Sequence, residues 1–165
     1  MAPSTWQVVI LGAGPYGLAA AAHLQSRGVE TRVFGEAMAF WQRQMPAGML
    51  LRCAWDASHI ADPDHALTLN AFQAARGVQL PVPLPLERFV EYGTRFQRQV
   101  VPDLDPRMLT RIQRDQRGFQ VILEDGGSLQ AARAIVAAGL SGFAWRPPFF
   151  RGLPPWPHTP PSTGI

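Results

Sequence analysis

The sequence contains almost no cysteine and no lysine at all. Cys53 is the only cysteine among 165 residues, so no disulfide can form within the chain and an oxidising compartment is not implied. All 15 basic residues are arginines, and they are spread along the chain without forming a basic stripe interleaved with aromatic residues. This distribution argues against a nucleic-acid partner, although the net charge is +3.

The sequence also lacks a long apolar run and a basic leader. The longest apolar stretch, near Leu18–Leu24, is far too short to cross a bilayer. No arginine precedes the first apolar segment, which argues against a signal peptide. We therefore expect a soluble, cytoplasmic protein without a membrane partner.

The most informative pattern present is a glycine-rich turn between an apolar strand and an alanine-rich helix. We expect the strand over Trp6–Leu11 and the helix over Pro15–Arg27. Gly12 permits the tight turn, Gly14 lets phosphate oxygens approach the backbone, and Gly17 lets the helix pack closely on the strand. The sequence therefore predicts that a dinucleotide binds with its pyrophosphate at the start of this helix.

Two further strands complete a predicted parallel sheet. Thr31–Phe34 follows the helix and ends near an acidic residue, Glu36. A strand, a helix and a second strand in this order form a unit whose strands lie parallel. Arg133–Gly139 is an apolar segment that ends in glycine, which predicts a fully buried third strand. The hydrophobic content of 47% is sufficient for the core of one domain.

Helices and a hairpin are expected between the second and third parallel strands. Thr68 is a predicted N-cap of a helix that ends at Gly77, and a proline-rich extended connector follows at Leu80–Pro85. From Leu86 to Phe96, apolar residues recur at helical spacing and predict an amphipathic helix. A β-hairpin or meander is then predicted from alternating residues and an Asp-Gly turn, at Met108–Gln113, Phe119–Glu124, Asp125–Gly127 and Leu129–Ala131.

Residues 36–64 show no clear periodicity. Four residues that can ligate metals lie close together there, but their spacing matches no standard ligand pattern, so we interpret them as a solvated loop: His59, Asp62, Asp64 and His65. We interpret Cys53 as a buried apolar residue. No Gly-x-Ser-x-Gly elbow is present, so nothing indicates a hydrolase triad.

The combination of these features resembles a known family. The sequence is similar to the N-terminal half of two-dinucleotide flavoprotein monooxygenases, in particular lysine/ornithine N-hydroxylase-like and flavin-containing monooxygenase-like enzymes. The resemblance runs from Trp6 to Pro155. It rests on the glycine turn, Trp41 just past the second strand, Met49–Arg52, the amphipathic helix after a proline-rich connector, the hairpin, and Ala134–Gly139.

The resemblance implies that this half holds FAD. The implied fold is α/β, a Rossmann-like FAD/NAD(P)-binding domain of three layers with a parallel sheet, a helical insertion and a small antiparallel hairpin. In the family, the glycine turn holds the pyrophosphate, an acid after the second strand binds the adenosine ribose, and other residues flank the adenine and the flavin. The positions of this sequence that match are Gly12, Gly14, Pro15, Tyr16 and Gly17 for the pyrophosphate, Glu36 for the ribose, Leu109 for the adenine, Gly139 for close approach to the cofactor, and Trp41 and Arg52 near the flavin.

Three of these assignments have alternatives. The usual position of the ribose-binding acid is taken by Gly35, with Glu36 one place later. Trp41 is equally consistent with a core residue, and Arg52 with a surface arginine. Catalytic residues are not identified, and no metal is expected.

The sequence has one glycine turn where the family has two. The second turn binds NADPH in the family, and no such motif is present in these 165 residues. We therefore expect residues 1–145 to be an incomplete FAD-binding domain and residues 146–165 to be a proline-rich tail. The expected function is the FAD-binding portion of a flavin-dependent oxidoreductase or monooxygenase, inactive alone. In the complete enzyme NADPH would reduce the flavin, which would react with O₂ to oxygenate a small-molecule substrate. The alternatives are a non-catalytic, truncated nucleotide-binding remnant and a single-site NAD(P)-dependent dehydrogenase.

Overall fold

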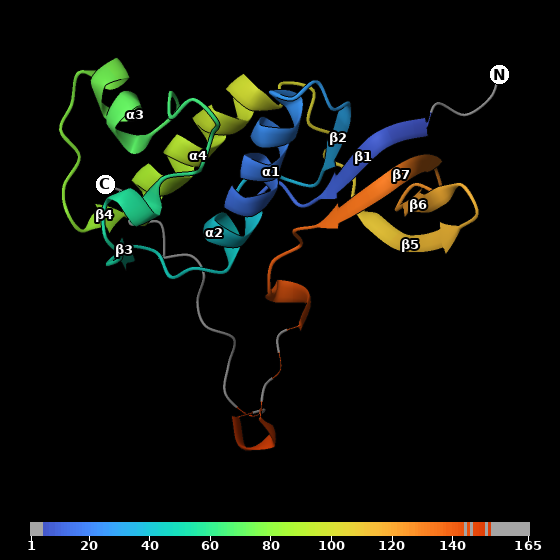
Figure 1. The fold of residues 1–165 in the computed structure, drawn as a ribbon. Coiled ribbons are helices and arrows are strands. Elements are labelled where there is room, and N and C mark those ends of the chain that lie inside the picture. The colour runs from blue at the N-terminus through green and yellow to red at the C-terminus, as the bar shows by residue number, and fades with distance from the viewer. Residues whose placement is uncertain (1–4, 144, 146, 151, 153–165) are drawn as a thin grey trace.

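The fold is one twisted sheet with helices packed against it (Figure 1). The computed structural model describes residues 5–143, 145, 147–150 and 152. Most of the proline-rich tail predicted for residues 146–165 lies outside the described residues. Five strands form the sheet in the order β2-β1-β7-β6-β5, which confirms the predicted α/β class.

The parallel part of the sheet agrees with the prediction from the glycine turn. Strand β1 (Thr5–Leu11) leads through the turn into helix α1 (Pro15–Gln25), and strand β2 (Thr31–Phe34) follows. Helix α1 ends two residues earlier than predicted. Strand β1 lies between β2 and β7 (Ser128–Val136) and pairs parallel with both. The predicted three parallel strands are therefore confirmed.

Strand β7 corrects the prediction of two separate segments, Leu129–Ala131 and Arg133–Gly139. It is a single strand that ends at Val136, and its first half pairs antiparallel with β6 while Gln130 to Val136 pair parallel with β1. It is also not fully buried, because Arg133 is exposed and Val136 is 65% exposed. One strand therefore belongs to both parts of the sheet.

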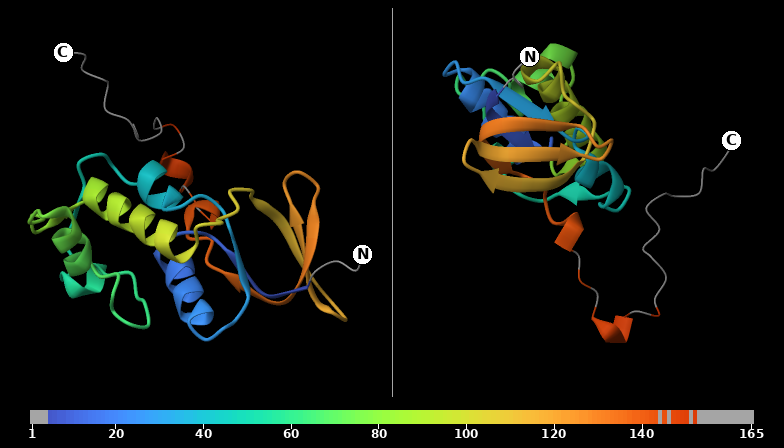
Figure 2. Two further views of the ribbon diagram at one scale, coloured as in Figure 1. Left: turned by 90° about the horizontal axis from the view of Figure 1, so that it is seen from above. Right: turned by 90° about the vertical axis from the view of Figure 1, so that its right-hand side faces the viewer.

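The antiparallel part of the sheet forms a second core. Strands β5 (Leu109–Asp115) and β6 (Gly118–Leu123) pair antiparallel as predicted, and Figure 2 shows them at the end of the molecule opposite helix α3. Val121 and Leu123 of β6 pack with Val9 and Phe34 of the parallel strands. The antiparallel strands thus continue the same five-stranded sheet, and their apolar side chains pack with those of β1 and β2.

The insertion between β2 and β5 contains short elements as well as the two predicted helices. Its bounds are α2 (Ala39–Arg43), β3 (Leu50–Leu51), the 3₁₀ turn η1 (Asp56–Ser58), α3 (Leu69–Arg76), β4 (Leu84–Pro85) and α4 (Leu86–Val100). Two 3₁₀ turns follow β7, at Ser141–Phe143 and Pro148–Phe150. The caps predicted for α3 are confirmed, because the Thr68 hydroxyl accepts a hydrogen bond from the Ala71 N–H and Gly77 ends the helix in a left-handed conformation.

Helix α4 is the centre of the main core. Its buried face consists of Leu86, Phe89, Tyr92, Gly93 and Phe96, and all of these except Tyr92 belong to the spacing that predicted the helix. Gly93 allows close contact with Met38, since a Cβ at that position would overlap the Met38 side chain. The core on this side of the sheet also takes in Ile10, Leu18 and Val33.

Two predictions about residues 36–64 are wrong. Cys53 is exposed, because strand β3 ends at Leu51 and the chain then runs along the surface, with the Cys53 sulfur 3.0 Å from the Ser58 hydroxyl. Asp62 is buried and not solvated, because its carboxylate accepts hydrogen bonds from the N–H groups of Ala66 and Leu67. No helix in the described part of the chain is long and apolar enough to cross a membrane.

Candidate dinucleotide-binding site

The carboxyl ends of the three parallel strands meet at one edge of the sheet. The Gly12 N–H donates to the Phe34 carbonyl at 2.8 Å, and the Ala137 N–H donates to the Leu11 carbonyl at 2.7 Å. Gly35 lies against Gly12, since a Cβ on Gly35 would be 3.6 Å from the Gly12 Cα. This edge is where ligands bind in open parallel sheets, at the point where the chain connections diverge.

Two glycines of the turn are required by the fold itself. Gly12 has φ of +109°, and a Cβ there would overlap the Ala137 carbonyl. A Cβ on Gly17 would overlap the Gly12 carbonyl, because α1 packs directly against the turn. These contacts fix the turn against β7 and hold the first turn of α1 in place.

Gly14 differs from both of them. Its backbone is extended, with φ of −82°, a conformation open to any residue, and a Cβ there would meet nothing within 4 Å. The fold alone therefore does not require glycine at this position. The space in front of the Gly14 backbone is what a pyrophosphate needs, so the residues present fit such a group.

The backbone N–H groups in the first turn of α1 have no hydrogen-bond acceptor within the helix. Gly14 is the N-cap residue, no side chain caps the helix, and no acidic residue lies in the first turn. Pro15 occupies the first helical position, where its missing N–H costs nothing, and the side chain of Tyr16 is 86% exposed. An anion at this helix start would interact with free N–H groups and with the positive end of the helix dipole.

Glu36 stands directly after Gly35 at the end of β2. Its carboxylate forms an ion pair with Arg43 of α2. Helix α2 is itself tied to the glycine turn, because the Met38 N–H at its start donates to the Ala13 carbonyl at 3.0 Å. Glu36 is therefore held at the edge of the site by its ion pair with a neighbouring helix.

Trp41 packs in the core as well as lying just past β2. Its ring is partly buried and meets the Phe89 ring edge-on, with 4.8 Å between centroids. This contact joins α2 to α4. This packing supports a core role for Trp41, which is one of the two roles that the sequence left open. It does not test a position of Trp41 near the flavin.

The other predicted site residues lie on separate elements. Arg52 follows β3 and is exposed, with no ion pair found within the described part of the chain. Leu109 opens β5 and packs in the second core. Gly139 lies three residues beyond the end of β7, with φ of +71° and open space around it. The structure thus brings Gly12–Gly17, Glu36 and Gly139 to one edge, and it leaves Arg52 on the insertion.

A charged cluster that the sequence analysis missed supports this edge. The backbone of Asp105 pairs with β2, since the Gly35 N–H donates to its carbonyl at 2.9 Å. The buried Asp105 carboxylate accepts hydrogen bonds from Arg32 at 3.0 Å and from Arg107 at 2.7 and 2.9 Å. Arg107 also pairs with Asp125 in the β6–β7 turn.

The ion pairs set the charge state of this cluster. Hydrogen bonds from Arg107 hold the pKa of the Asp105 carboxyl well below its usual range, against the opposing effect of burial. Hydrogen bonds from Arg107 and from the Gly127 N–H lower the pKa of Asp125. No sequence motif predicts the cluster, because Arg32, Asp105 and Asp125 are far apart in the chain.

These elements define the class of fold: an α/β fold with a glycine turn between a parallel strand and a helix, in a mixed sheet that continues from β7 into the antiparallel strands β6 and β5. No family model and no curated protein matches the sequence. Solved structures do match, and they confirm the expected resemblance at the level of the fold.

The matching structures include monooxygenases and bacillithiol disulfide reductases. The chain is similar to a flavin-containing monooxygenase from Stenotrophomonas maltophilia, with a TM-score of 0.70 and 18% identity over 87% of this chain and 41% of that one. It is similar to the bacillithiol disulfide reductase Bdr from Bacillus cereus, with a TM-score of 0.65 and 22% identity over 82% of this chain and 40% of that one. An oxidised steroid monooxygenase bound to NADP matches with a TM-score of 0.64 and 20% identity, over 82% and 26%. The chain therefore spans about two-fifths or less of the length of these proteins.

Proposed function

We propose that this chain binds FAD at the glycine turn and forms the FAD-binding part of a flavin-dependent oxidoreductase of the monooxygenase type. The observation that carries the proposal is the contrast within the turn. Gly12 and Gly17 are required by the fold, whereas Gly14 faces open space that only a ligand would need to keep free. The fold would accept a side chain at position 14, whereas a bound pyrophosphate would not.

In this proposal, each element at the edge of the sheet binds a different part of the cofactor. The backbone N–H groups of Gly14, Tyr16 and Gly17 bind the pyrophosphate, and the Glu36 carboxylate accepts hydrogen bonds from the adenosine ribose. The backbone near Leu109 flanks the adenine, and Gly139 lets the cofactor approach the end of β7. When bound, FAD supplies the redox chemistry, and the chain's own residues bind and orient it and exclude water.

Apolar side chains near the end of β7 support a flavin at this edge. Val136, Leu140 and Phe143 are 65%, 74% and 79% exposed. Where exposed apolar side chains form one patch, the patch marks a surface that another group covers. In the proposed function, the flavin end of the cofactor and the NADPH-binding portion of a complete enzyme cover them.

A single-site NAD(P)-dependent dehydrogenase is the second candidate. The glycine turn alone is as consistent with NAD(P) binding as with FAD binding. The long insertion from α2 to α4 and the hairpin of β5 and β6 argue against it, because a simple dehydrogenase rarely places both between its second and third parallel strands. A cytoplasmic location and a small-molecule substrate for the complete enzyme stay predictions.

Cofactor preference tests the proposal directly. The purified chain should bind FAD more tightly than NADH or NADPH in parallel calorimetric titrations, and bound flavin should show a shifted absorbance spectrum. ADP, which lacks the flavin, serves as the matched control for the shared adenosine and pyrophosphate contacts. Tighter binding of NADH than of FAD would favour the dehydrogenase, and no binding of any of these ligands would remove the proposed site.

A further inference from the structure

Two opposite charges stand together at the edge of the sheet where the adenosine ribose is proposed to bind. The Glu36 carboxylate comes directly after β2 and its end, and it pairs with the Arg43 guanidinium of α2. Both side chains keep access to solvent, since Glu36 is 42% and Arg43 65% exposed. The proposed function uses the carboxylate and leaves the guanidinium without a role.

Helix α2 holds Arg43 at this edge. The Met38 N–H at the start of the helix donates to the Ala13 carbonyl of the glycine turn at 3.0 Å, and the buried Met38 side chain lies against Gly93 of α4. The Trp41 ring packs against α4 as well. Arg43, two residues beyond Trp41, therefore belongs to a segment that is fixed both to the turn and to α4.

Two other arginines near this edge are already occupied by acids. Each of them pairs with two carboxylates: Arg32 with Asp103 and Asp105, and Arg107 with Asp105 and Asp125. Arg43 differs, because in the described part of the chain it pairs with one carboxylate, and that carboxylate is exposed. Its guanidinium is therefore the one that a change at Glu36 would release.

The 2′ position of the adenosine ribose distinguishes two kinds of adenine dinucleotide. FAD and NADH carry a hydroxyl there, and NADPH carries a phosphate. A carboxylate at the end of the second strand accepts a hydrogen bond from the hydroxyl and repels the phosphate, whereas an arginine nearby accommodates the phosphate. This edge of the sheet holds one group of each kind, and the carboxylate occupies the arginine.

We propose that the Glu36–Arg43 pair determines which dinucleotides the site accepts: ligands with a free 2′-hydroxyl bind, and ligands with a 2′-phosphate are rejected. Glu36 acts in two ways, because its charge repels the phosphate and its ion pair withholds the Arg43 guanidinium. Removal of the Glu36 charge would release Arg43 and open a site for the 2′-phosphate. The inference rests on the proposed function, since it requires the ribose to lie at Glu36. Such a pair would keep NADPH out of the FAD site in an enzyme that uses both.

ADP-ribose and 2′-phospho-ADP-ribose are the probes, because they differ only in the 2′-phosphate and carry no redox group. In calorimetric titrations at low salt, the parent chain should bind ADP-ribose at least about fivefold more tightly, the scale of one exposed charge pair. Glu36→Gln should shift the ratio of the two affinities at least about tenfold toward the phosphorylated probe, since the repulsion is lost and Arg43 is released. The double variant Glu36→Gln/Arg43→Gln should show a shift at least about threefold smaller, because no guanidinium is left to pair with the phosphate.

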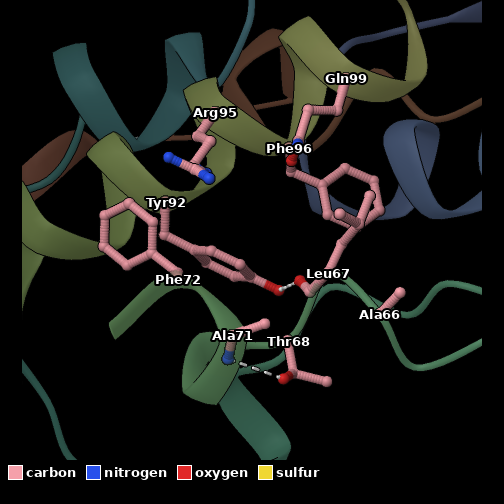
Figure 3. A pocket seen from close by; sticks show the side chains of 9 residues that line it. All are labelled: Ala66, Leu67, Thr68, Ala71, Phe72, Tyr92, Arg95, Phe96 and Gln99. Atoms are coloured by element: carbon pink, nitrogen blue, oxygen red, sulfur yellow. Dashed lines mark hydrogen bonds between the residues drawn. The ribbon is translucent and has the colours of Figure 1, made fainter. Parts of the chain in front are cut away.

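Glu91→Gln is the matched control, since it also removes a carboxylate that pairs with arginines. Glu91 of α4 pairs with Arg76 of α3 and with Arg88. Figure 1 shows α3 on the far side of α4 from the sheet, and Figure 3 shows the contact of the two helices around Phe72 and Tyr92. The control variant should therefore leave the ratio of the two affinities unchanged.

Three outcomes would overturn the inference while FAD binding stands. They are equal binding of both probes to the parent, a ratio that Glu36→Gln leaves unchanged, and shifts of equal size in the single and double variants. A shift with Glu91→Gln as large as with Glu36→Gln would attribute the effect to net charge and overturn the inference as well. Failure of the proposed function gives a different result, because the parent would then bind neither probe and no FAD.

Discussion

Replacing Gly14 with valine separates binding from folding at the glycine turn. The backbone at Gly14 is extended and a Cβ there meets no atom within 4 Å, so the strand and helix on either side accept a side chain. A branched side chain would instead occupy the space in front of the backbone where the pyrophosphate lies. We expect FAD affinity to fall by more than tenfold, which corresponds to about 1.4 kcal/mol or more.

The cost of this substitution in stability is small and can be stated separately. Valine is a poorer N-cap than glycine, so Gly14→Val should lower the free energy of unfolding by about 1 kcal/mol at most. Gly17→Ala is the contrasting variant, because its Cβ would overlap the Gly12 carbonyl. We expect Gly17→Ala to cost about 3 kcal/mol, the upper end of what overpacking costs.

Two measurements distinguish these effects. Calorimetric titration with FAD gives the affinity, and thermal unfolding followed by far-UV circular dichroism gives the stability of the same preparations. The reasoning predicts lost binding with a retained fold for Gly14→Val, and a lower melting temperature for Gly17→Ala. A Gly14→Val protein that bound FAD as tightly as the parent would show that the phosphates bind elsewhere.

Three further predictions concern the charged groups and the absent second glycine turn. Asp105→Asn should destabilise the fold by about 2–3 kcal/mol, since the arginine partners are only partly exposed, and it should remove a loss of stability that the parent shows as pH falls below about 4. Because the pKa of Asp105 is lowered in the folded protein, its carboxylate contributes fully to stability above the pKa of the unfolded state, and this contribution is lost on acidification. Equal acid sensitivity of parent and variant in thermal melts would contradict this prediction. Glu36→Gln should weaken FAD binding about tenfold. Adding Arg43→Gln should change the affinity little more, because the ion pair between Glu36 and Arg43 is already lost. Unchanged affinity of Glu36→Gln in calorimetry would rule out the ribose role of Glu36. The chain saturated with FAD should oxidise NADPH no faster than free FAD, because its sequence has no second glycine turn to position a nicotinamide. Steady protein-dependent consumption of NADPH in an absorbance assay would refute this.

The sequence predicted those parts of the fold that depend on local chemistry. The glycine turn and the two ends of α3 were predictable because Gly12, Thr68 and Gly77 each meet a requirement of their own backbone. The amphipathic face of α4 was predictable because its period is carried by large apolar residues. The position of the candidate site at the strand ends followed from the same local signals.

The remaining parts depend on contacts between distant segments. Strands β3 and β4 have two residues each and exist because Leu50–Leu51 and Leu84–Pro85 pair with each other. Strand β7 was predicted as two segments because Leu129–Ala131 was assigned to the hairpin and Arg133–Gly139 to the parallel sheet, whereas one continuous strand pairs with both β6 and β1. The Asp105 cluster was not predicted, since its partners come together only when the antiparallel layer is in place.

The central position of β1 has a consequence for the order in which the chain can fold. Its partner on one side, β2, follows shortly after it, but on the other side Thr5 pairs with Gln130. At about 5–20 residues per second, the ribosome needs on the order of 10 s to deliver β7 after β1 has emerged. During that interval the apolar strand Thr5–Leu11 has an open edge, which is a template for pairing with other chains. Folding of the parallel sheet is therefore a late, long-range event, and the nascent protein needs protection at this edge until β7 arrives.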